Sequence, residues 1–252
     1  MSYANKVSFR VIFLSLIGLL SIPFYFIMGG ELIFFLFVRL FAHIIGLFSP
    51  IGYHRWLTHN QFEPNIIGKI LLSMGIISSG LGSPLHHAIA HKTHHPHYDT
   101  NDDPHSPERL GFFKLWLGQY KIKNGTRPPK SFFRNKLGMF LHNYYWKIWC
   151  LCNIIIFIIF DLKTMLIFLP LNFTYSWLVN TLINYYGHYD PKTKTFGPRN
   201  TSKIFTLITA GEGLHKNHHE RQNEVDFSGN GRKDPMINFI QLISKNDPNF
   251  ST

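Results

Sequence analysis

The sequence predicts an all-α integral membrane protein, with four transmembrane helices in two hairpins and a helical cap on the cytoplasmic side. Two observations support this fold class. Of the 252 residues, 45% are hydrophobic and only 15% are charged, whereas a soluble domain carries about 25% charged residues. The hydrophobic residues also form runs about as long as a helix needs to cross a bilayer. We therefore expect a single membrane domain over residues 1–252.

The first hairpin is predicted from two runs near the N-terminus. Residues 11–28 carry no charge, and residues 32–51 are interrupted only by Arg39 and His43. We predict spanning helices over both ranges. Residues 11–28 could instead form a signal peptide, but a second span follows directly and no small-residue cleavage site precedes it. The first run is therefore interpreted as an uncleaved membrane helix.

The second hairpin is predicted over residues 146–160 and 164–186, joined by Asp161, Leu162 and Lys163. Another apolar stretch, residues 66–85, contains four glycines and Pro84, which makes it a poor spanning helix. An interfacial or partly buried helix is expected there. Segments 121–136 and 190–200 are polar and contain proline, so both are predicted to be loops.

The charge distribution predicts the orientation in the membrane. Residues 51–147 hold 12 Lys and Arg against 5 Asp and Glu, and the net charge of the chain is +11. By the positive-inside rule, both termini and residues 52–145 and 187–252 are cytoplasmic. In a soluble chain this charge would suggest nucleic acid, but here it faces anionic lipid headgroups. We expect no nucleic-acid partner, and an endoplasmic reticulum or bacterial inner membrane location.

Histidine is the unusual residue type, with 15 copies. Eight of them form three clusters: His54 and His59; His91, His94 and His95; His215, His218 and His219. The last two clusters share the spacing H-x-x-H-H, which in a helix puts all three rings on one face, able to point at one centre. The five-residue step of the first cluster is looser, because an α-helix turns its two ends about 140° apart.

Eight histidines exceed the four ligands that close a tetrahedral zinc site, so they suggest two metal ions. Imidazole suits zinc, copper, iron and nickel, so ligand type alone does not name the metal. The remaining histidines have less specific positions, and we interpret His43, His97, His105 and His142 as ordinary polar residues. The roles of His86 and His87 stay open. Cys150 and Cys152 match no zinc motif.

Two alternatives follow from the residues alone. A His-rich metal transporter would place its ligands near the middle of the membrane, whereas these clusters lie outside the hydrophobic runs. Arg39 and His43 lie at i and i+4 in the second predicted helix. An ionisable pair there indicates either a functional role or an arginine that extends its head to a neighbouring group, and the two readings are equally supported.

The motifs resemble those of the membrane-bound fatty acyl desaturases of the stearoyl-CoA type. The matching runs are Gly-Tyr-His-Arg-Trp-Leu-Thr-His at 52–59, His-Lys-Thr-His-His at 91–95, and Gly-Glu-Gly-Leu-His-Lys-Asn-His-His at 211–219. An Asn-x-x-x-His element, Asn184 with His188, also matches. Two features depart from the family pattern: Lys92 stands where arginine is usual, and Leu115 to Tyr120 lacks a polar motif often found there.

This resemblance implies an enzyme that uses two iron ions, O2 and two electrons to form a double bond in a fatty acyl chain, by default at position nine of an acyl-CoA. It assigns one iron to His54, His59, His95 and His219, with a water held by Asn184. It assigns the other iron to His91, His94, His188, His215 and His218. Four acidic residues would orient the rings from behind, namely Asp99, Asp102, Asp103 and Glu212.

The resemblance also implies a separate electron donor, such as cytochrome b5 or a ferredoxin, because the sequence has no His-Pro-Gly-Gly haem motif and no cysteine cluster. A related membrane hydroxylase is the main alternative activity. The motifs do not separate it from a desaturase.

Overall fold

The computed structural model describes residues 3–120, 122 and 126–245. Its secondary structure is almost entirely helical, which confirms the predicted class. Among the described residues, the one sheet pairs β1 (Tyr189–Asp190) with β2 (Thr195–Phe196) in antiparallel register. This hairpin overlaps the predicted loop 190–200 and begins one residue before it. The predicted loop 121–136 holds the short helix α7 (Lys130–Arg134), and its residues 121 and 123–125 lie outside the described part.

Among the described residues, three helices are long and apolar enough to cross a membrane. They are α1 (Tyr3–Ile27), α2 (Leu32–Gly46) with its continuation to Thr58, and α9 (Leu162–Tyr186). Their outward faces expose large apolar side chains, for example Leu20 at 64% and Ile33 at 82%. Exposed apolar surface of this extent needs an apolar surrounding. The lipid bilayer supplies it.

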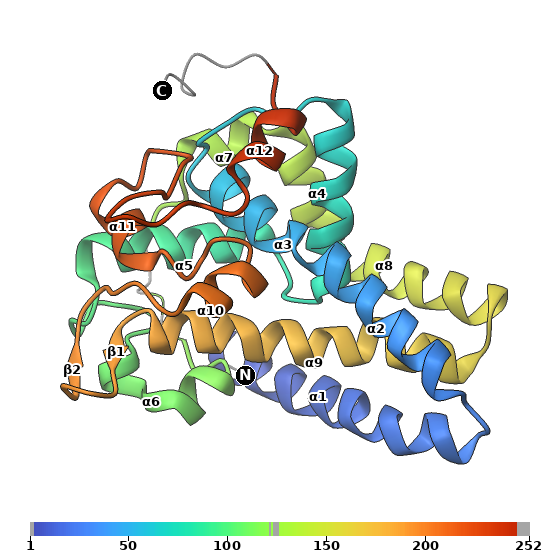
Figure 1. Cartoon of the computed structure of the whole chain (residues 1–252). Helices are drawn as coiled ribbons and strands as arrows, with labels where there is room; N and C mark the ends of the chain where they lie inside the picture. The colour runs from blue at the N-terminus through green and yellow to red at the C-terminus, as the bar shows by residue number, and fades with distance from the viewer. Residues whose placement is uncertain (1–2, 121, 123–125, 246–252) are drawn as a thin grey trace.

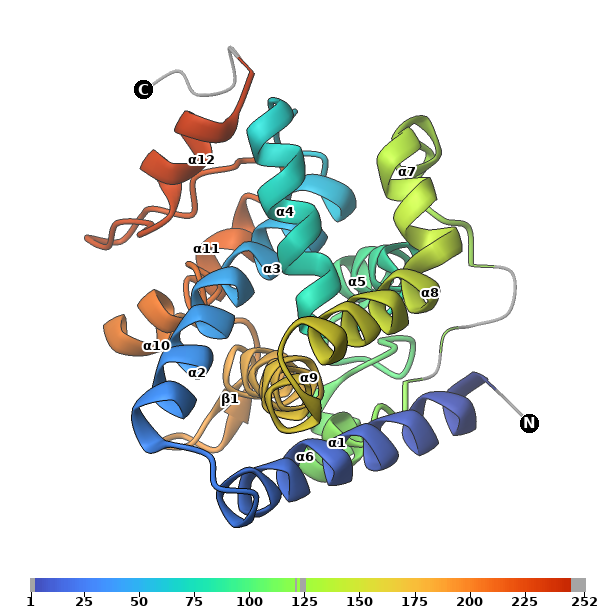
Figure 2. The same ribbon diagram turned by 90° about the vertical axis from the view of Figure 1, so that its right-hand side faces the viewer.

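Helix α9 lies at the centre of the fold. It packs against α1, α2, α4, α6 and α8, and Figure 2 shows α1, α2 and α8 arranged around it. Close packing with α1 depends on Gly18, because a Cβ there would lie 2.6 Å from the carbonyl oxygen of Pro170. The buried Asn172 of α9 donates a hydrogen bond to the Ser78 carbonyl of α4 at 2.9 Å. These contacts fix the membrane helices around α9.

Three of the four expected spans correspond to candidate spans among the described helices, and the one expected over residues 146–160 does not. Helix α8 (Lys136–Ile159) begins ten residues before the predicted 146, and it is not among the candidate spans. Its N-terminal half carries Lys136, His142 and Lys147, which lower its mean hydropathy. Helices α4 (Ile66–Ser79) and α5 (Pro84–His97) meet at 87° and form a fourth candidate only as one bent span. The described helices therefore include three or four candidate spans.

The second span also extends further than predicted. Helix α2 continues through α3 (Phe48–Pro50) into a π-helix, η1 (Ile51–Thr58). The helix therefore continues seven residues past residue 51, where the sequence predicted the span to end. The first histidine cluster lies at the tip of this helix, and every residue of η1 is buried.

The remaining helices form a cap over one end of the membrane helices (Figure 1). They are α5, α6 (Pro107–Trp116), α7, α10 (Lys203–Ile208), α11 (His215–Glu220) and α12 (Ile237–Ile243). Local sequence sets several of their ends. Ser83 and Ser106 accept hydrogen bonds from backbone N–H groups at the starts of α5 and α6, and proline follows each of them, as is typical of helix N-termini. The terminal residues 1–2 and 246–252 lie outside the described part, and the cytoplasmic side of the termini stays a prediction.

Candidate metal centre

The first histidine pair depends on the π-helix. In η1 the backbone N–H of His59 donates to the carbonyl of His54 at 2.9 Å, the i to i+5 bond of a π-turn. This wider turn brings the two residues to one side of the helix, with ring centroids 4.8 Å apart. An α-helix would have separated them. The looser spacing of this cluster is therefore matched by a change of helix type.

The two H-x-x-H-H clusters lie on α5 and α11, and each one divides between two centres. In an α-helix, residues i and i+4 lie about 40° apart around the axis, whereas i+3 and i+4 lie about 100° apart. On α5, His91 and His95 join one centre and His94 joins the other. On α11, His215 and His219 share a centre and His218 belongs to the neighbouring one. Each helix therefore contributes to both centres.

Nine imidazoles form two adjacent groups, and within each group the potential ligand atoms lie within 4.8 Å of one another. His188 follows the C-terminal end of α9 and is 1% exposed, so a membrane helix supplies the ninth ring. Group A contains His54, His59, His91, His95 and His218, and group B contains His94, His188, His215 and His219.

This division corrects the assignment that the sequence resemblance implied. His91 and His218 lie in group A with His54, and His219 lies in group B with His188. The resemblance had assigned His91 and His218 to the same iron as His188, and His219 to the same iron as His54. The reason is geometric, because each i, i+4 pair stays together while the residue between them turns to the second centre. The nine histidines of groups A and B are the same nine that the resemblance implied.

Three carboxylates orient rings from behind. Glu212 contacts His54 at 2.6 Å, Asp103 contacts His94 at 2.9 Å, and Asp99 contacts His188 at 2.8 Å, in each case at Nδ1. A carboxylate can only accept, so each Nδ1 carries the hydrogen and the neutral ring presents a lone pair at Nε2. Partners of this kind typically fix the rings of metal-binding histidines. The fourth expected acid, Asp102, is exposed on the turn after α5.

The donor set fits metal ions. The Nε2 atoms of His94 and His188 face each other at 3.0 Å, although both rings hold their hydrogen at Nδ1 and both Nε2 atoms therefore present lone pairs. Two lone pairs repel at this distance unless a cation lies between them. Nitrogens bound at about 2.1 Å to one ion at right angles are about 3 Å apart. In group A, His218 Nε2 lies 2.9 Å from both His54 Nε2 and His95 Nε2.

Burial keeps the rings in the form that metals need. Desolvation lowers the pKa of His215 and of His218 well below the ordinary value, and the neighbouring imidazoles lower both pKa values further. The pKa of His219 is lowered by the same two causes. Neutral imidazole is the metal-binding form. The Nε2 atoms of His59 and His219 are also buried without a hydrogen-bond partner among the described residues.

Three residues near the groups were not predicted from the sequence to belong to the site, and His105 had been interpreted as an ordinary polar residue. Lys92 Nζ lies 3.1 Å from His59 Nδ1, so the residue that departs from the family pattern touches a ligand ring. His105 is 5% exposed and stacks on His94 with ring centroids 4.4 Å apart. In the sequence, the position of His105 two residues after Asp103 was the signal that could have placed it near the site. His87 contacts Thr58 and stacks on His91, but it belongs to neither group.

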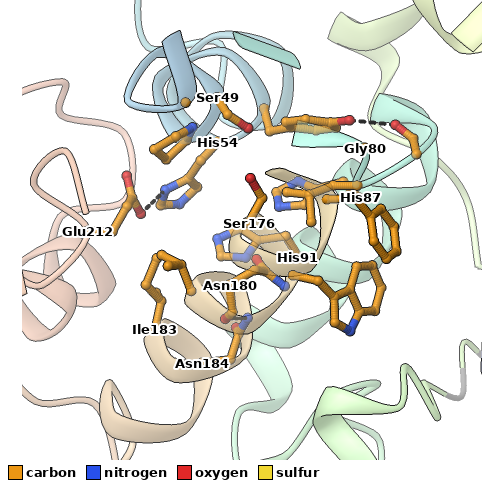
Figure 3. A pocket seen from close by; sticks show the side chains of 18 of the residues that line it. Ser49, His54, Gly80, His87, His91, Ser176, Asn180, Ile183, Asn184 and Glu212 are labelled. Carbon is orange, nitrogen blue, oxygen red and sulfur yellow. Dashed lines mark hydrogen bonds and ion pairs between the residues drawn. The ribbon is translucent and has the colours of Figure 1, made fainter. Parts of the chain in front are cut away.

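A cavity of about 380 Å³ runs beside the two groups and between the helices. Figure 3 shows His54, His91, Asn180 and Asn184 around it. Asn184 is half-buried and donates to the Asn180 carbonyl at 2.8 Å. Apolar side chains line much of the rest, including Leu47, Phe173, Trp177, Ile183 and Ile208. One part of its lining is polar and comes from Arg10, Ser83, His86 and His142.

Arg39 and His43 have different surroundings. Arg39 donates to the Ile167 carbonyl of α9 at 2.9 Å, so it ties α2 to α9. His43 lines the cavity and lies 3.0 Å from the hydroxyl of Tyr175. Arg39 therefore fits the alternative in which an arginine extends its head to a neighbouring group, whereas His43 adjoins the cavity.

These features define a class of protein: a multi-pass membrane protein with two adjacent buried imidazole groups beside a largely apolar cavity. A comparison with protein families gives a match to the fatty acid desaturase family over residues 32–223. The chain belongs to this family, as the histidine motifs predicted. The match includes all nine histidines of groups A and B.

Several curated proteins are similar to the chain. It is 30% identical to an acyl-CoA 5-desaturase of Anemone leveillei, over 79% of the chain and 64% of that protein. It is 27% identical to an sn-1 stearoyl-lipid 9-desaturase of Anabaena variabilis, over 70% of the chain and 67% of that protein. It is 27% identical to a stearoyl-CoA desaturase of Bos taurus, over 71% of the chain and 55% of that protein. The chain thus spans just over half to two thirds of these relatives.

Proposed function

We propose that the protein is an O2-dependent fatty acyl desaturase with two iron ions. The observation that carries the proposal is the pair of adjacent imidazole groups beside a largely apolar cavity between membrane helices. Imidazole is a suitable ligand for iron, and the cavity suits an acyl chain. Membership of the fatty acid desaturase family supports the same reaction.

The five histidines of group A would hold one ion and the four of group B the other. Asn184 completes the set by holding a water, because its side chain lines the cavity beside the groups. When bound, the irons supply the activation of O2. Every other part of the reaction depends on how the chain holds its ligands and its substrate.

The reaction balances with two electrons from outside. An acyl chain loses two hydrogen atoms, O2 is reduced by four electrons in total, and two protons from solvent complete the formation of two waters. The chain's residues position the acyl carbons, and they exclude bulk water because the ligand histidines other than His219 are at most 8% exposed. Exclusion of water protects a strong oxidant from side reactions.

We place the polar head of the substrate beside Arg10, Ser83, His86 and His142, because these residues form the polar part of the cavity lining. The guanidinium of Arg10 also lies over the ring of Trp146 at 4.3 Å. We propose acyl-CoA as the substrate and position nine as the site of the double bond. The names of the relatives include positions 5 and 9 and both CoA and lipid carriers, so product analysis has to distinguish these outcomes.

We propose a separate one-electron carrier, such as cytochrome b5 or a ferredoxin, as the donor. The basic excess over residues 51–147 would attract an acidic protein. Turnover should then weaken as salt rises, because exposed charges are screened over about 10 Å at 0.1 M ionic strength. A rate that does not change with salt at subsaturating donor would contradict this electrostatic attraction.

Expression in a desaturase-deficient host tests the proposal. We expect fatty-acid profiling to reveal a new unsaturated acid that is absent with the His94→Ala variant. An acid that has gained an oxygen atom would indicate the related hydroxylase instead. No new lipid product, from a protein shown to carry iron and supplied with a competent donor, would refute the proposed function.

A further inference from the structure

Arg55 is the residue after the ligand His54, and it is fully buried. Its Nη1 lies 2.5 Å from Asp234 Oδ2 and donates to the Val225 carbonyl at 2.8 Å. Its Nη2 donates to the Ala210 carbonyl at 3.3 Å. A guanidinium in such a place needs partners for its several donors, and three separate parts of the C-terminal region provide them.

Asp234 organises the segment that covers the metal centre. Its Oδ2 accepts the backbone N–H of Phe227 at 3.2 Å, and its Oδ1 accepts that of Met236 at 2.9 Å. Phe227 is 1% exposed, and its ring centroid lies 4.6 Å from His218 and 5.9 Å from His54. The guanidinium of Arg55 lies over the same ring at 3.8 Å. Phe227 and Asp234 are both beyond the residues that the family match covers.

Glu212 connects this network to the ligand itself. Its Oε2 contacts His54 Nδ1 at 2.6 Å, and its Oε1 lies 3.8 Å from Arg55 Nε. Both Glu212 Oε1 and Arg55 Nε are buried without a hydrogen-bond partner in the described structure, and the two atoms form an ion pair across this distance. The guanidinium thus stands between two carboxylates, and the one on Glu212 also faces a ligand of group A.

The backbone beside this network fits around it. Gly211 has φ of +90°, a conformation that favours glycine. A Cβ at this position would collide with the Arg55 guanidinium and lie 2.7 Å from Asp234 Oδ1. The glycine therefore lets the chain pass directly beside the ion pair.

We propose that Arg55 and Asp234 are positioning residues of the metal centre: their ion pair seats Phe227 against His54 and His218 and steadies Glu212 against His54. The segment from Val225 to Asp234 is then part of the wall of group A. This inference rests on the proposed two-metal function. A simpler role would be to attach the C-terminal segment to the fold, which would affect stability but not the bound metal.

Metal release distinguishes the two roles. The full-length protein, purified in detergent with iron bound, is mixed with a chelator and the rate of iron loss is followed. Asp234→Asn removes the charge and keeps the shape. We expect it to lose iron about tenfold faster at a temperature well below its unfolding midpoint, since loss of a group behind a ligand typically costs 10- to 100-fold in metal affinity or activity.

A second readout and a control accompany this measurement. After reloading with Co2+, the visible absorption spectrum of Asp234→Asn and of Phe227→Leu should differ from that of the parent, because His54 and His218 are held differently. The control is Glu63→Gln. Glu63 forms ion pairs with Lys69 at 2.6 Å and with Lys245 of the C-terminal segment at 3.7 Å, and it touches neither metal group, so its iron loss and spectrum should match the parent.

A folded Asp234→Asn protein with the parent's iron-loss rate and cobalt spectrum would overturn the proposal, even if its unfolding midpoint were lower. If this variant does not fold, Phe227→Leu decides, and an unchanged spectrum and iron-loss rate would have the same meaning. Failure of the proposed function has a different signature. A parent protein that binds two metals but forms no lipid product would leave the positioning roles intact.

Discussion

At the scale of single residues, the tautomers of the ligands follow from their acidic partners. Asp103 and Asp99 hold the Nδ1 hydrogens of His94 and His188, which leaves two Nε2 lone pairs facing each other at 3.0 Å. This arrangement is unfavourable without a cation and favourable with one. The side chains behind the ligands therefore indicate metal binding as directly as the ligands themselves.

His188 tests the contribution of the membrane helix to the centre. We expect His188→Ala to lose activity and group B metal, because His188 Nε2 lies 3.0 Å from the Nε2 atoms of both His94 and His215. His97→Ala is the matched control, since His97 is exposed at the end of the same cap helix that carries His94. Two metals per chain and normal turnover in His188→Ala would exclude it as a ligand, and His87 would then be tested.

Asp99 and Asp102 lie on the same turn and form a matched pair for mutagenesis. Asp99 contacts His188, whereas Asp102 is exposed. Asp99 has φ of +57°, and asparagine tolerates this conformation, so Asp99→Asn changes the charge without straining the backbone. We expect Asp99→Asn to lower activity by about 10- to 100-fold and Asp102→Asn to leave it within about twofold of the parent. Steady-state rates under identical donor supply compare them, and equal effects would contradict the role of Asp99.

At the scale of elements, the sequence predicted the existence of helices better than it predicted where their side chains point. The spacing of His91, His94 and His95 was correctly interpreted as a metal motif. The expectation that all three rings face one centre was wrong, because i+3 and i+4 diverge around a helix. His54 and His59 meet through a π-turn, and the five-residue spacing alone did not specify that turn.

The limits of the membrane helices were also only partly predictable. Residues 146–160 are apolar, but α8 starts at Lys136 because Asn135 caps it there through a hydrogen bond to the backbone N–H of Gly138. The break between α4 and α5 was signalled by its residues. Gly80 has φ of +70° and Pro84 begins the next helix, which ends one element and starts another at a sharp angle.

The packing of α1 on α9 gives a prediction of stability. Gly18→Ala should destabilise the protein by about 1–3 kcal/mol, the usual cost of overpacking, because the added Cβ meets the backbone of α9. Gly46→Ala is the control, since a Cβ there has nothing within 4 Å. Thermal unfolding of both variants in one detergent measures the difference. Equal midpoints would mean that α1 does not pack closely on α9.

At the scale of the whole molecule, the exposed apolar faces of the membrane helices and the basic cap predict one orientation. The turn between β1 and β2 should face the cytoplasm, and the tip between α1 and α2 should face the opposite side. Single cysteines at Thr193 and Glu31, both exposed, report the two sides once Cys150 and Cys152 are replaced. In sealed vesicles of known orientation, an impermeant reagent should label only one of them. Labelling of both from the same side would refute this topology.

The proposed two-metal centre is assembled from four separated parts of the chain: η1, α5, the end of α9 and α11. No part supplies a complete ligand set, so the centre exists only in the folded whole. The family resemblance identified the nine rings, and the three-dimensional arrangement was needed to divide them. This division is the central claim of the account.

Anomalous diffraction at the iron edge, on crystals of the iron-loaded protein, tests that division most directly. We predict two peaks, one contacted by His54, His59, His91, His95 and His218, and the other by His94, His188, His215 and His219. A single peak, or two peaks with His91 and His218 bound to the same ion as His188 and His215, would contradict the account.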